Sequence, residues 1–151
     1  GNLKALVLIS SAGIKPKNGE IAEMFMVSGE TRLKNAFYDP SQVPDYEFFT
    51  RERSSDETAM AHSNMEMLSR LAWKPYLHSP SLPHYLPKVK VPTLLVWGKQ
   101  DAVIPLECGE LFQKAIPNAQ LTVIDNCGHR PQMEKPSDFL EALTSFLGGL
   151  S

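Results

Sequence analysis

Residues 91–101 read Val-Pro-Thr-Leu-Leu-Val-Trp-Gly-Lys-Gln-Asp, and residues 121–136 read Leu-Thr-Val-Ile-Asp-Asn-Cys-Gly-His-Arg-Pro-Gln-Met-Glu-Lys-Pro. Each stretch begins with an apolar run that contains β-branched residues and that a glycine, Gly98 or Gly128, then interrupts. Short apolar runs bounded by turn residues are typical of strands buried inside a parallel sheet. The two stretches therefore predict two strands, Thr93–Trp97 and Gln120–Ile124.

The segment between these strands has the pattern of an amphipathic helix. Pro105 suits its first turn, and apolar residues recur at the spacing of one helix face: Cys108, Leu111, Phe112, Ala115 and Ile116. A strand, helix and strand connected in this way form a right-handed crossover, so both strands end at the same edge of the sheet. We therefore expect Asp101 and His129 to meet there, with the carboxylate within hydrogen-bond reach of the imidazole Nδ1.

These residues resemble the C-terminal half of an α/β-hydrolase. The matching motifs are Gly98-Lys99-Gln100-Asp101 with Ile104-Pro105, and Gly128-His129 with Pro131 and Glu134-Lys135-Pro136. In that family the triad acid follows the seventh strand and the His follows the eighth. The resemblance implies that Asp101 orients the catalytic base and that His129 is that base. It covers Leu3–Ser11 and Val89–Leu147 well, and the residues between them loosely.

The chain departs from the family pattern because it contains no Gly-x-Ser-x-Gly motif. Its first apolar run, Leu3–Ile9, predicts a third parallel strand buried on both faces. In the resembling family this is the sixth strand, which follows the nucleophile elbow. We therefore expect the nucleophile and oxyanion hole to lie before Gly1, and residues 1–151 alone to be inactive. Ser10 and Ser11 end this strand, but without an elbow around them they are interpreted as polar loop residues.

Residues 13–87 are predicted to form a helical cap or lid inserted into a core made of residues 1–12 and 88–151. Helical spacing runs from Ile21 to Phe37, and Ser54 with Glu57 forms a capping box. An apolar stripe follows the box: Met60, Ala61, Met65, Leu68 and Leu71. A short helical piece is predicted over Leu71–Tyr76. An extended return to the sheet is predicted through four prolines: Pro75, Pro80, Pro83 and Pro87.

The composition of the predicted lid favours an apolar substrate, because thioether and aromatic side chains make adaptable pocket walls. The candidate substrate-binding residues are Met24, Phe25, Trp73 and Tyr76. The alternative is that such residues pack the lid's own small core. Three further histidines lie in this segment or at its exit and are assigned surface or packing roles: His62, His78 and His84.

Composition excludes several classes of function. The 151 residues carry a formal net charge of −2 with acidic and basic residues interspersed, so neither nucleic acid nor an anionic membrane is expected as a partner. The longest apolar runs are too short to span a bilayer. Cys108 and Cys127 lack metal-ligand spacing and are expected to be reduced, as in the cytoplasm. No metal or cofactor is expected.

Together these patterns predict an α/β fold: a partial α/β-hydrolase sheet of three parallel strands, flanking helices and an inserted lid. The first functional hypothesis is a carboxylic-ester-type or related acyl hydrolase with a Ser-Asp-His triad. Asp-nucleophile epoxide or haloalkane hydrolases and C–C bond hydrolases share the acid and His motifs. A hypothesis of another class is a non-catalytic interaction module. A nucleophile motif before Gly1 favours an enzyme, whereas a start Met there favours the module. In either case Leu3–Ile9 is expected to pair with a missing N-terminal half or with itself.

Overall fold

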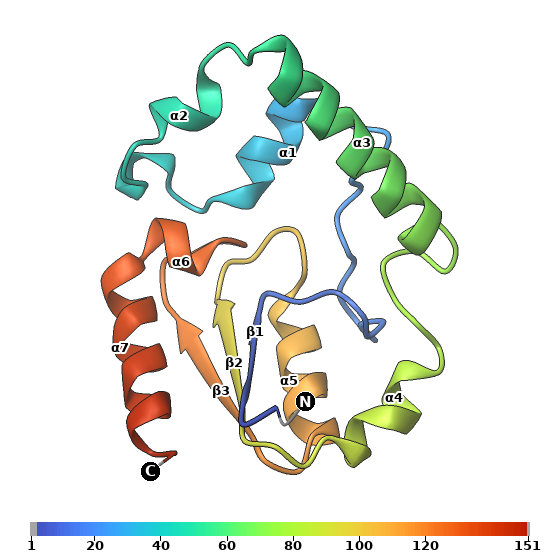
Figure 1. The fold of residues 1–151 in the computed structure, drawn as a ribbon, viewed down its shortest axis with the longest axis vertical. Coiled ribbons are helices and arrows are strands. Elements are labelled where there is room, and N and C mark those ends of the chain that lie inside the picture. Colours follow the sequence, from blue (N-terminus) through green and yellow to red (C-terminus); the bar gives the residue numbers. More distant parts are fainter. Residues whose placement is uncertain (1–2, 151) are drawn as a thin grey trace.

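The computed structural model describes residues 3–150; Gly1, Asn2 and Ser151, which belong to the predicted core segment, lie outside the described residues. The elements follow one another as β1 (Leu6–Ile9), α1 (Gly29–Ala36), η1 (Pro40–Gln42), α2 (Glu47–Thr50), α3 (Ser55–Ala72), α4 (Leu82–Tyr85), η2 (Leu86–Lys88), β2 (Thr93–Gly98), α5 (Leu106–Ala115), β3 (Ala119–Ile124), α6 (Pro131–Glu134) and α7 (Pro136–Gly148) (Figure 1).

The three strands form one parallel sheet in the order β1-β2-β3, which confirms the predicted α/β fold. Every residue of β2 is buried, as expected for a central parallel strand. β1 is shorter than the predicted Leu3–Ile9, since Leu3, Lys4 and Ala5 lie outside it. The Leu6 N–H donates to the Pro92 carbonyl at 3.0 Å. The ladder ends near this point because Pro92 has no N–H with which to donate the next hydrogen bond to the first strand.

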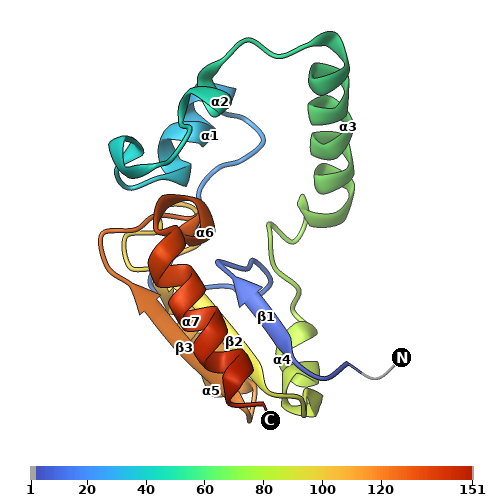
Figure 2. The same ribbon diagram turned by 60° about the vertical axis from the view of Figure 1, so that its left-hand side comes forward.

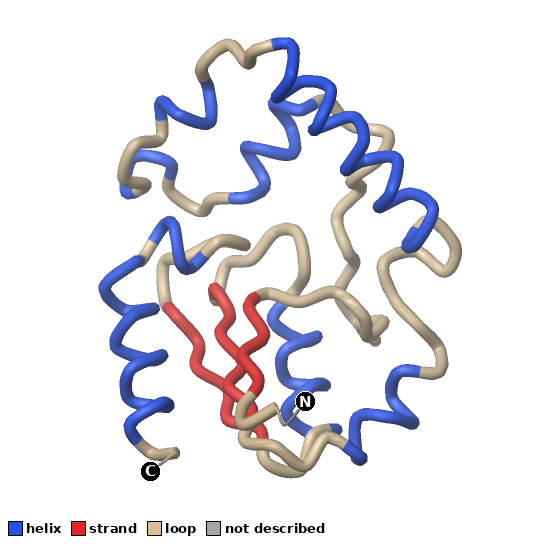
Figure 3. The backbone as a smooth tube through the Cα atoms, viewed as in Figure 1, coloured by secondary structure: helices blue, strands red, loops and turns tan. Residues whose placement is uncertain are grey.

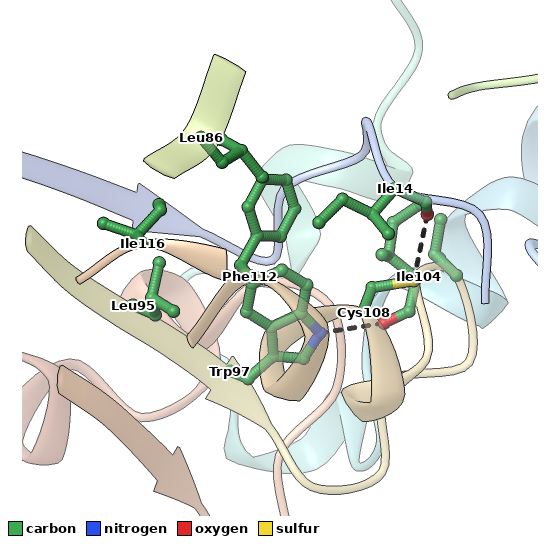
Figure 4. Packing of buried hydrophobic residues seen from close by; sticks show 9 residues of the cluster. Ile14, Leu86, Leu95, Trp97, Ile104, Cys108, Phe112 and Ile116 are labelled. Carbon is green, nitrogen blue, oxygen red and sulfur yellow. Dashed lines mark hydrogen bonds between the residues drawn. The ribbon is translucent and has the colours of Figure 1, made fainter. Parts of the chain in front are cut away.

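The sheet is covered on both faces. On one face, Leu95 and Trp97 of β2 pack against Cys108 and Phe112 of α5, and the Trp97 indole N–H donates to the Ile104 carbonyl at 2.9 Å (Figure 4). On the other face, the alternate β2 side chains pack against α7 in a cluster made of Leu94, Val96, Ile124, Cys127 and Phe146. Figure 2 shows α5 and α7 on opposite sides of the sheet. The predicted apolar face of α5 is thus confirmed as a core face.

The predicted insertion, residues 13–87, consists of helices and loops. The part that contains α1, α2 and α3 extends beyond the carboxyl ends of the strands, whereas α4 lies beside the sheet toward the amino ends of the strands (Figure 1, Figure 3). The predicted capping box is present, with the Ser54 hydroxyl accepting the Glu57 N–H and the Glu57 carboxylate accepting the Ser54 N–H. The apolar stripe behind it does not pack as expected, because no residue of α3 is buried and the Met60 and Leu71 side chains are 64% and 79% exposed.

The predicted helical spacing before Ser28 is wrong, because α1 begins only at Gly29. The Glu23 carboxylate accepts the N–H groups of Phe25 and Met26, which holds this stretch in a turn. The Ser28 hydroxyl then caps α1 by accepting the Thr31 N–H. Side-chain acceptors for backbone N–H groups therefore decide where the helix starts.

Two further predictions in the insertion are wrong. The α3 helix ends at Ala72 and continues as turns, so Leu71–Tyr76 is not a separate helical piece. The proline-rich return to the sheet contains α4 and η2 instead of running extended. Both short helices carry a proline in the first turn, where its missing N–H has no intrahelical partner to lose.

One edge of β1 has no neighbour in the described structure, since β1 pairs only with β2. The N–H groups of Leu6 and Ser10 donate toward the β2 side. In a parallel ladder the alternate residues, Val7 and Ile9, then point their N–H groups at the free edge. No proline or central charge protects this edge.

We therefore expect chain 1–151 to recruit another strand at this edge and to self-associate when no partner is supplied. Sedimentation velocity at micromolar concentration measures this. Val7→Pro removes one free-edge donor without removing a donor to β2, and should shift the chain toward monomer. A monodisperse wild-type monomer would contradict the prediction.

Candidate active site

The loops after β2 and β3 bring Asp101 and His129 together. The His129 Nδ1 lies 3.0 Å from Asp101 Oδ2. The Asp101 side chain has no exposed surface, whereas that of His129 is 26% exposed. A carboxylate bound at Nδ1 fixes the imidazole tautomer and leaves Nε2 available as a proton acceptor.

The second oxygen of the buried Asp101 carboxylate is satisfied by the backbone. Its Oδ1 accepts the N–H groups of Val103 and Ile104 at 2.8 and 2.9 Å. These bonds hold the carboxylate in the loop that leads into α5 and compensate for its loss of hydration. Because one oxygen is bound to the backbone, the other remains directed at His129.

Two glycines allow the two loops to approach. A Cβ atom on Gly98 would lie 2.0 Å from the Gly128 carbonyl oxygen and 2.4 Å from that of Cys127. A Cβ atom on Gly128 would lie 2.7 Å from the Tyr38 backbone nitrogen. The glycines that mark the strand ends in the sequence therefore sit where the β2 loop, the His loop and the insertion meet.

The buried side chain of Glu134 also connects the His loop to the insertion by hydrogen bonds. The Glu134 carboxylate accepts the Gly128 N–H at one oxygen and the Asp39 N–H at the other, both at 2.6 Å. The His129 N–H donates to the Ala36 carbonyl at 3.0 Å. Sequence reasoning placed Glu134 only in a motif; its position five residues after His129 was the available signal for this role.

His129 lies in the wall of a cavity of about 1160 Å³ between the sheet edge and the insertion. Three apolar residues contribute to this wall: Ile9 from β1, Val103 from the loop after β2, and Met24 from the insertion. One face of α3 lines it at helical spacing, with residues Thr58, Ala61, His62 and Met65. The α3 residues in the wall are half-buried or exposed, so this face borders a hollow rather than a packed core.

Of the four candidate substrate-binding residues, Met24 lines this cavity and the other three do not. Phe25 packs edge-to-face on Trp73 and Tyr76, with ring centroids 5.1 and 5.8 Å apart. The Tyr76 hydroxyl accepts the Met24 N–H and donates to the Ala22 carbonyl, both at 2.7 Å. These aromatic residues thus anchor the strip of chain that carries Met24.

The sequence model of the family described as "alpha/beta hydrolase fold" matches residues 9–136 of this chain. The chain belongs to this family. This α/β-hydrolase chain is similar to the 2-hydroxy-6-oxononadienedioate/2-hydroxy-6-oxononatrienedioate hydrolase 2 of Pseudomonas putida, with 31% identity over 149 residues. These residues are 97% of this chain and 50% of the relative. It is 39% identical to the monoacylglycerol lipase ABHD6 of Mus musculus over 70 residues, which are 46% of this chain and 21% of the lipase.

Solved structures agree with this membership. A thermophilic esterase superposes with a TM-score of 0.74 at 29% identity, covering 98% of this chain and 57% of the esterase. A serine hydrolase involved in carbazole degradation superposes with a TM-score of 0.72 at 29% identity, covering 97% of this chain and 54% of that enzyme. The α/β-hydrolase chain spans about half the length of the Pseudomonas relative and of these two structures.

Within the described part of this α/β-hydrolase chain, no serine hydroxyl is hydrogen-bonded to His129. The Ser11 hydroxyl donates to the Ile9 carbonyl at 3.4 Å. The Ser10 hydroxyl is buried without a hydrogen-bond partner, and its backbone has a φ of 42°. Residues 3–150 also contain no group of three or more His, Cys, Asp or Glu side chains able to hold a metal ion, and no helix long and apolar enough to cross a bilayer.

The two cysteines are buried and free. Burial raises the pKa of the Cys108 thiol to about 11 and that of the Cys127 thiol to about 12. Because the thiolate is the reactive form and the raised pKa lowers its population near pH 8, both should alkylate with iodoacetamide roughly 10²-fold more slowly in the folded chain than in concentrated urea. Mass spectrometry of timed samples measures this. Rapid labelling of either cysteine in the folded chain would contradict it.

Proposed function

We propose that this chain supplies the acid and the general base of a Ser-Asp-His triad in an α/β-hydrolase that cleaves an ester or related acyl bond. In this proposal a nucleophile outside residues 1–151 attacks the acyl carbon, and Nε2 of His129 takes its proton. The Asp101 carboxylate at Nδ1 stabilises the imidazolium that forms. His129 then returns the proton to the leaving group.

The observation that carries the proposal is the Asp101–His129 hydrogen bond at the edge of a cavity. A buried carboxylate 3.0 Å from Nδ1, with its other oxygen bound by two backbone N–H groups, matches the orienting role. An interaction module would not need a buried carboxylate fixed on a partly exposed imidazole. We assign the insertion, residues 13–87, as the lid over this site.

The lid side of the cavity supports a substrate with an apolar part. Met24, Ala61 and Met65 contribute apolar surface near the His loop. Esterase and lipase relatives are consistent with an acyl bond as the target. The substrate class proposed is therefore an ester with a medium-sized apolar acyl or alkyl group.

A C–C bond hydrolase is the second candidate. The Pseudomonas relative, named for 2-hydroxy-6-oxononadienedioate and 2-hydroxy-6-oxononatrienedioate, matches 97% of this chain, whereas the lipase matches 46%. The same acid and base would serve this reaction. The two candidates differ in which substrate the complete site turns over.

The experiment joins residues 1–151 to the part of the Pseudomonas relative that lies outside the matched 149 residues. We refer to this chimera as the assembled hydrolase. Hydrolysis of 4-nitrophenyl butanoate and cleavage of 2-hydroxy-6-oxononadienedioate are measured side by side. We expect ester hydrolysis that His129→Ala abolishes, and no His129-dependent activity from residues 1–151 alone.

The control is the same chimera with the nucleophile of the added part replaced by Ala, which tests whether any activity arises from the cavity alone. Preferential cleavage of the dienedioate would select the second candidate. Activity in the folded chimera that survives His129→Ala would reject His129 as the base. Determining the residues encoded before Gly1 separates a Ser from an Asp nucleophile.

A further inference from the structure

Arg130, the residue directly after His129, is a half-buried cation that the proposed mechanism does not use. Its guanidinium lies over two aromatic rings of the insertion, 5.7 Å from the Phe37 centroid and 5.8 Å from the Phe49 centroid. Arg130, Phe49 and His129 all line the same cavity. The aromatic faces hold the guanidinium plane at the cavity wall beside the proposed base.

This cation has no carboxylate partner among residues 3–150. The ion pairs there join Arg51 to Glu57, Arg70 to Glu66, Lys99 to Asp125 and His129 to Asp101. The polar contact of the Arg130 guanidinium is with the Met133 sulfur at 4.0 Å, a weak acceptor. Partial burial lowers the pKa of Arg130 from its ordinary value, the direction expected for a cation with no counter-ion.

The other arginines of the cavity wall differ from Arg130. Arg32 donates to the Met24 and Val27 carbonyls, and Arg51 is paired with Glu57. Arg53, in the linker before α3, lines the wall as an exposed residue, whereas Arg130 is half-buried. The wall also contains the carboxylates of Glu30 and Glu52, which come from the insertion. Arg130 therefore stands out as the unpaired cation adjacent in sequence to His129.

We propose that Arg130 is a specificity-determining residue that binds a carboxylate group of the substrate within the cavity. This rests on the proposed function and deepens it: the preferred substrate has an anionic end for Arg130 and an apolar portion for the Met24 and Met65 side. A guanidinium presents paired donors that match the two oxygens of a carboxylate. A partly desolvated charge strengthens such a bond relative to one in open water.

Binding to residues 1–151 tests the subsite without requiring catalysis. The probes are octanoate and octanamide, which share an apolar tail and differ in charge. Arginine Nε–Hε signals are followed by NMR during each titration, and the Arg130 signal is the one absent from Arg130→Lys. We expect octanoate to shift this signal and to bind at least about 5-fold more tightly than octanamide, a preference that Arg130→Gln abolishes.

Arg70→Gln is the matched control, because Arg70 is exposed on α3, paired with Glu66 and outside the cavity wall. It should leave both titrations unchanged, and a native amide spectrum shows that each variant is folded. Equal affinity for both probes, or an octanoate preference that persists in folded Arg130→Gln, would overturn the subsite. These outcomes are independent of the ester assay, so an inactive assembled hydrolase would count against the proposed function alone.

Discussion

Asp101→Asn is expected to lower kcat of the assembled hydrolase by about 10⁴-fold while leaving the fold intact. In the wild type, Oδ1 accepts two backbone N–H groups and Oδ2 faces His129 Nδ1. The asparagine amide has one oxygen, and the two N–H donors of Val103 and Ile104 will hold it. Its NH₂ group then points at the imidazole.

An NH₂ group at Nδ1 reverses the tautomer of His129. Nδ1 must accept, so the proton moves to Nε2, which can no longer take a proton from the nucleophile. The loss should therefore fall on kcat rather than on KM. Steady-state ester hydrolysis and circular dichroism measure the two parts of this prediction.

Asp125→Asn is the matched control, since Asp125 is an exposed carboxylate paired with Lys99 at 3.0 Å after the other active-site strand. Solvent screens exposed pairs of this kind and they contribute little to stability, so activity should stay within a few-fold of wild type. Activity of folded Asp101→Asn close to that of the control would reject Asp101 as the orienting acid.

The second large effect is on stability. Gly98→Ala should lower the free energy of unfolding by more than about 3 kcal/mol, above the usual 1–3 kcal/mol for an overpacked core. The added Cβ would lie 2.0 Å from the Gly128 carbonyl oxygen. Because its neighbours are backbone atoms of the His loop, no side-chain rotation can relieve the overlap.

Urea unfolding monitored by circular dichroism measures this change. Gly148→Ala supplies the comparison, because a Cβ there meets no heavy atom within 4 Å. That substitution lies at the end of α7 and should be neutral or slightly stabilising, since alanine favours a helix. If Gly98→Ala unfolds at the same urea concentration as Gly148→Ala, the close approach of the two loops is not as described.

Local sequence patterns were sufficient to predict an element where the element's own residues form its buried face. Apolar runs predicted β2 and β3, and helical periodicity predicted α5, because their buried faces repeat at the period of the element itself. The crossover rule then placed Asp101 and His129 at one sheet edge. The Ser54–Glu57 box similarly marked the start of α3.

The insertion could not be predicted in the same way, because distant partners decide its backbone. The Ala22 N–H donates to the Val103 carbonyl, and the Tyr76 hydroxyl bonds the backbone at Met24. These contacts override the helical spacing of residues 21–28. Hydrophobic periodicity contains no information on such bonds, because each joins residues that are far apart in the chain.

The sequence by itself thus determined the α/β core, its family and the pairing of an acid with a histidine. The tertiary structure alone decided which side chains surround that pair. It left Trp73 outside the cavity wall, buried Glu134 between two backbone N–H groups, and set Arg130 over aromatic rings without a carboxylate. The physical reason is that charge and shape complementarity depend on residues far apart in the chain, whereas strand and helix patterns depend on residues that are neighbours in the sequence.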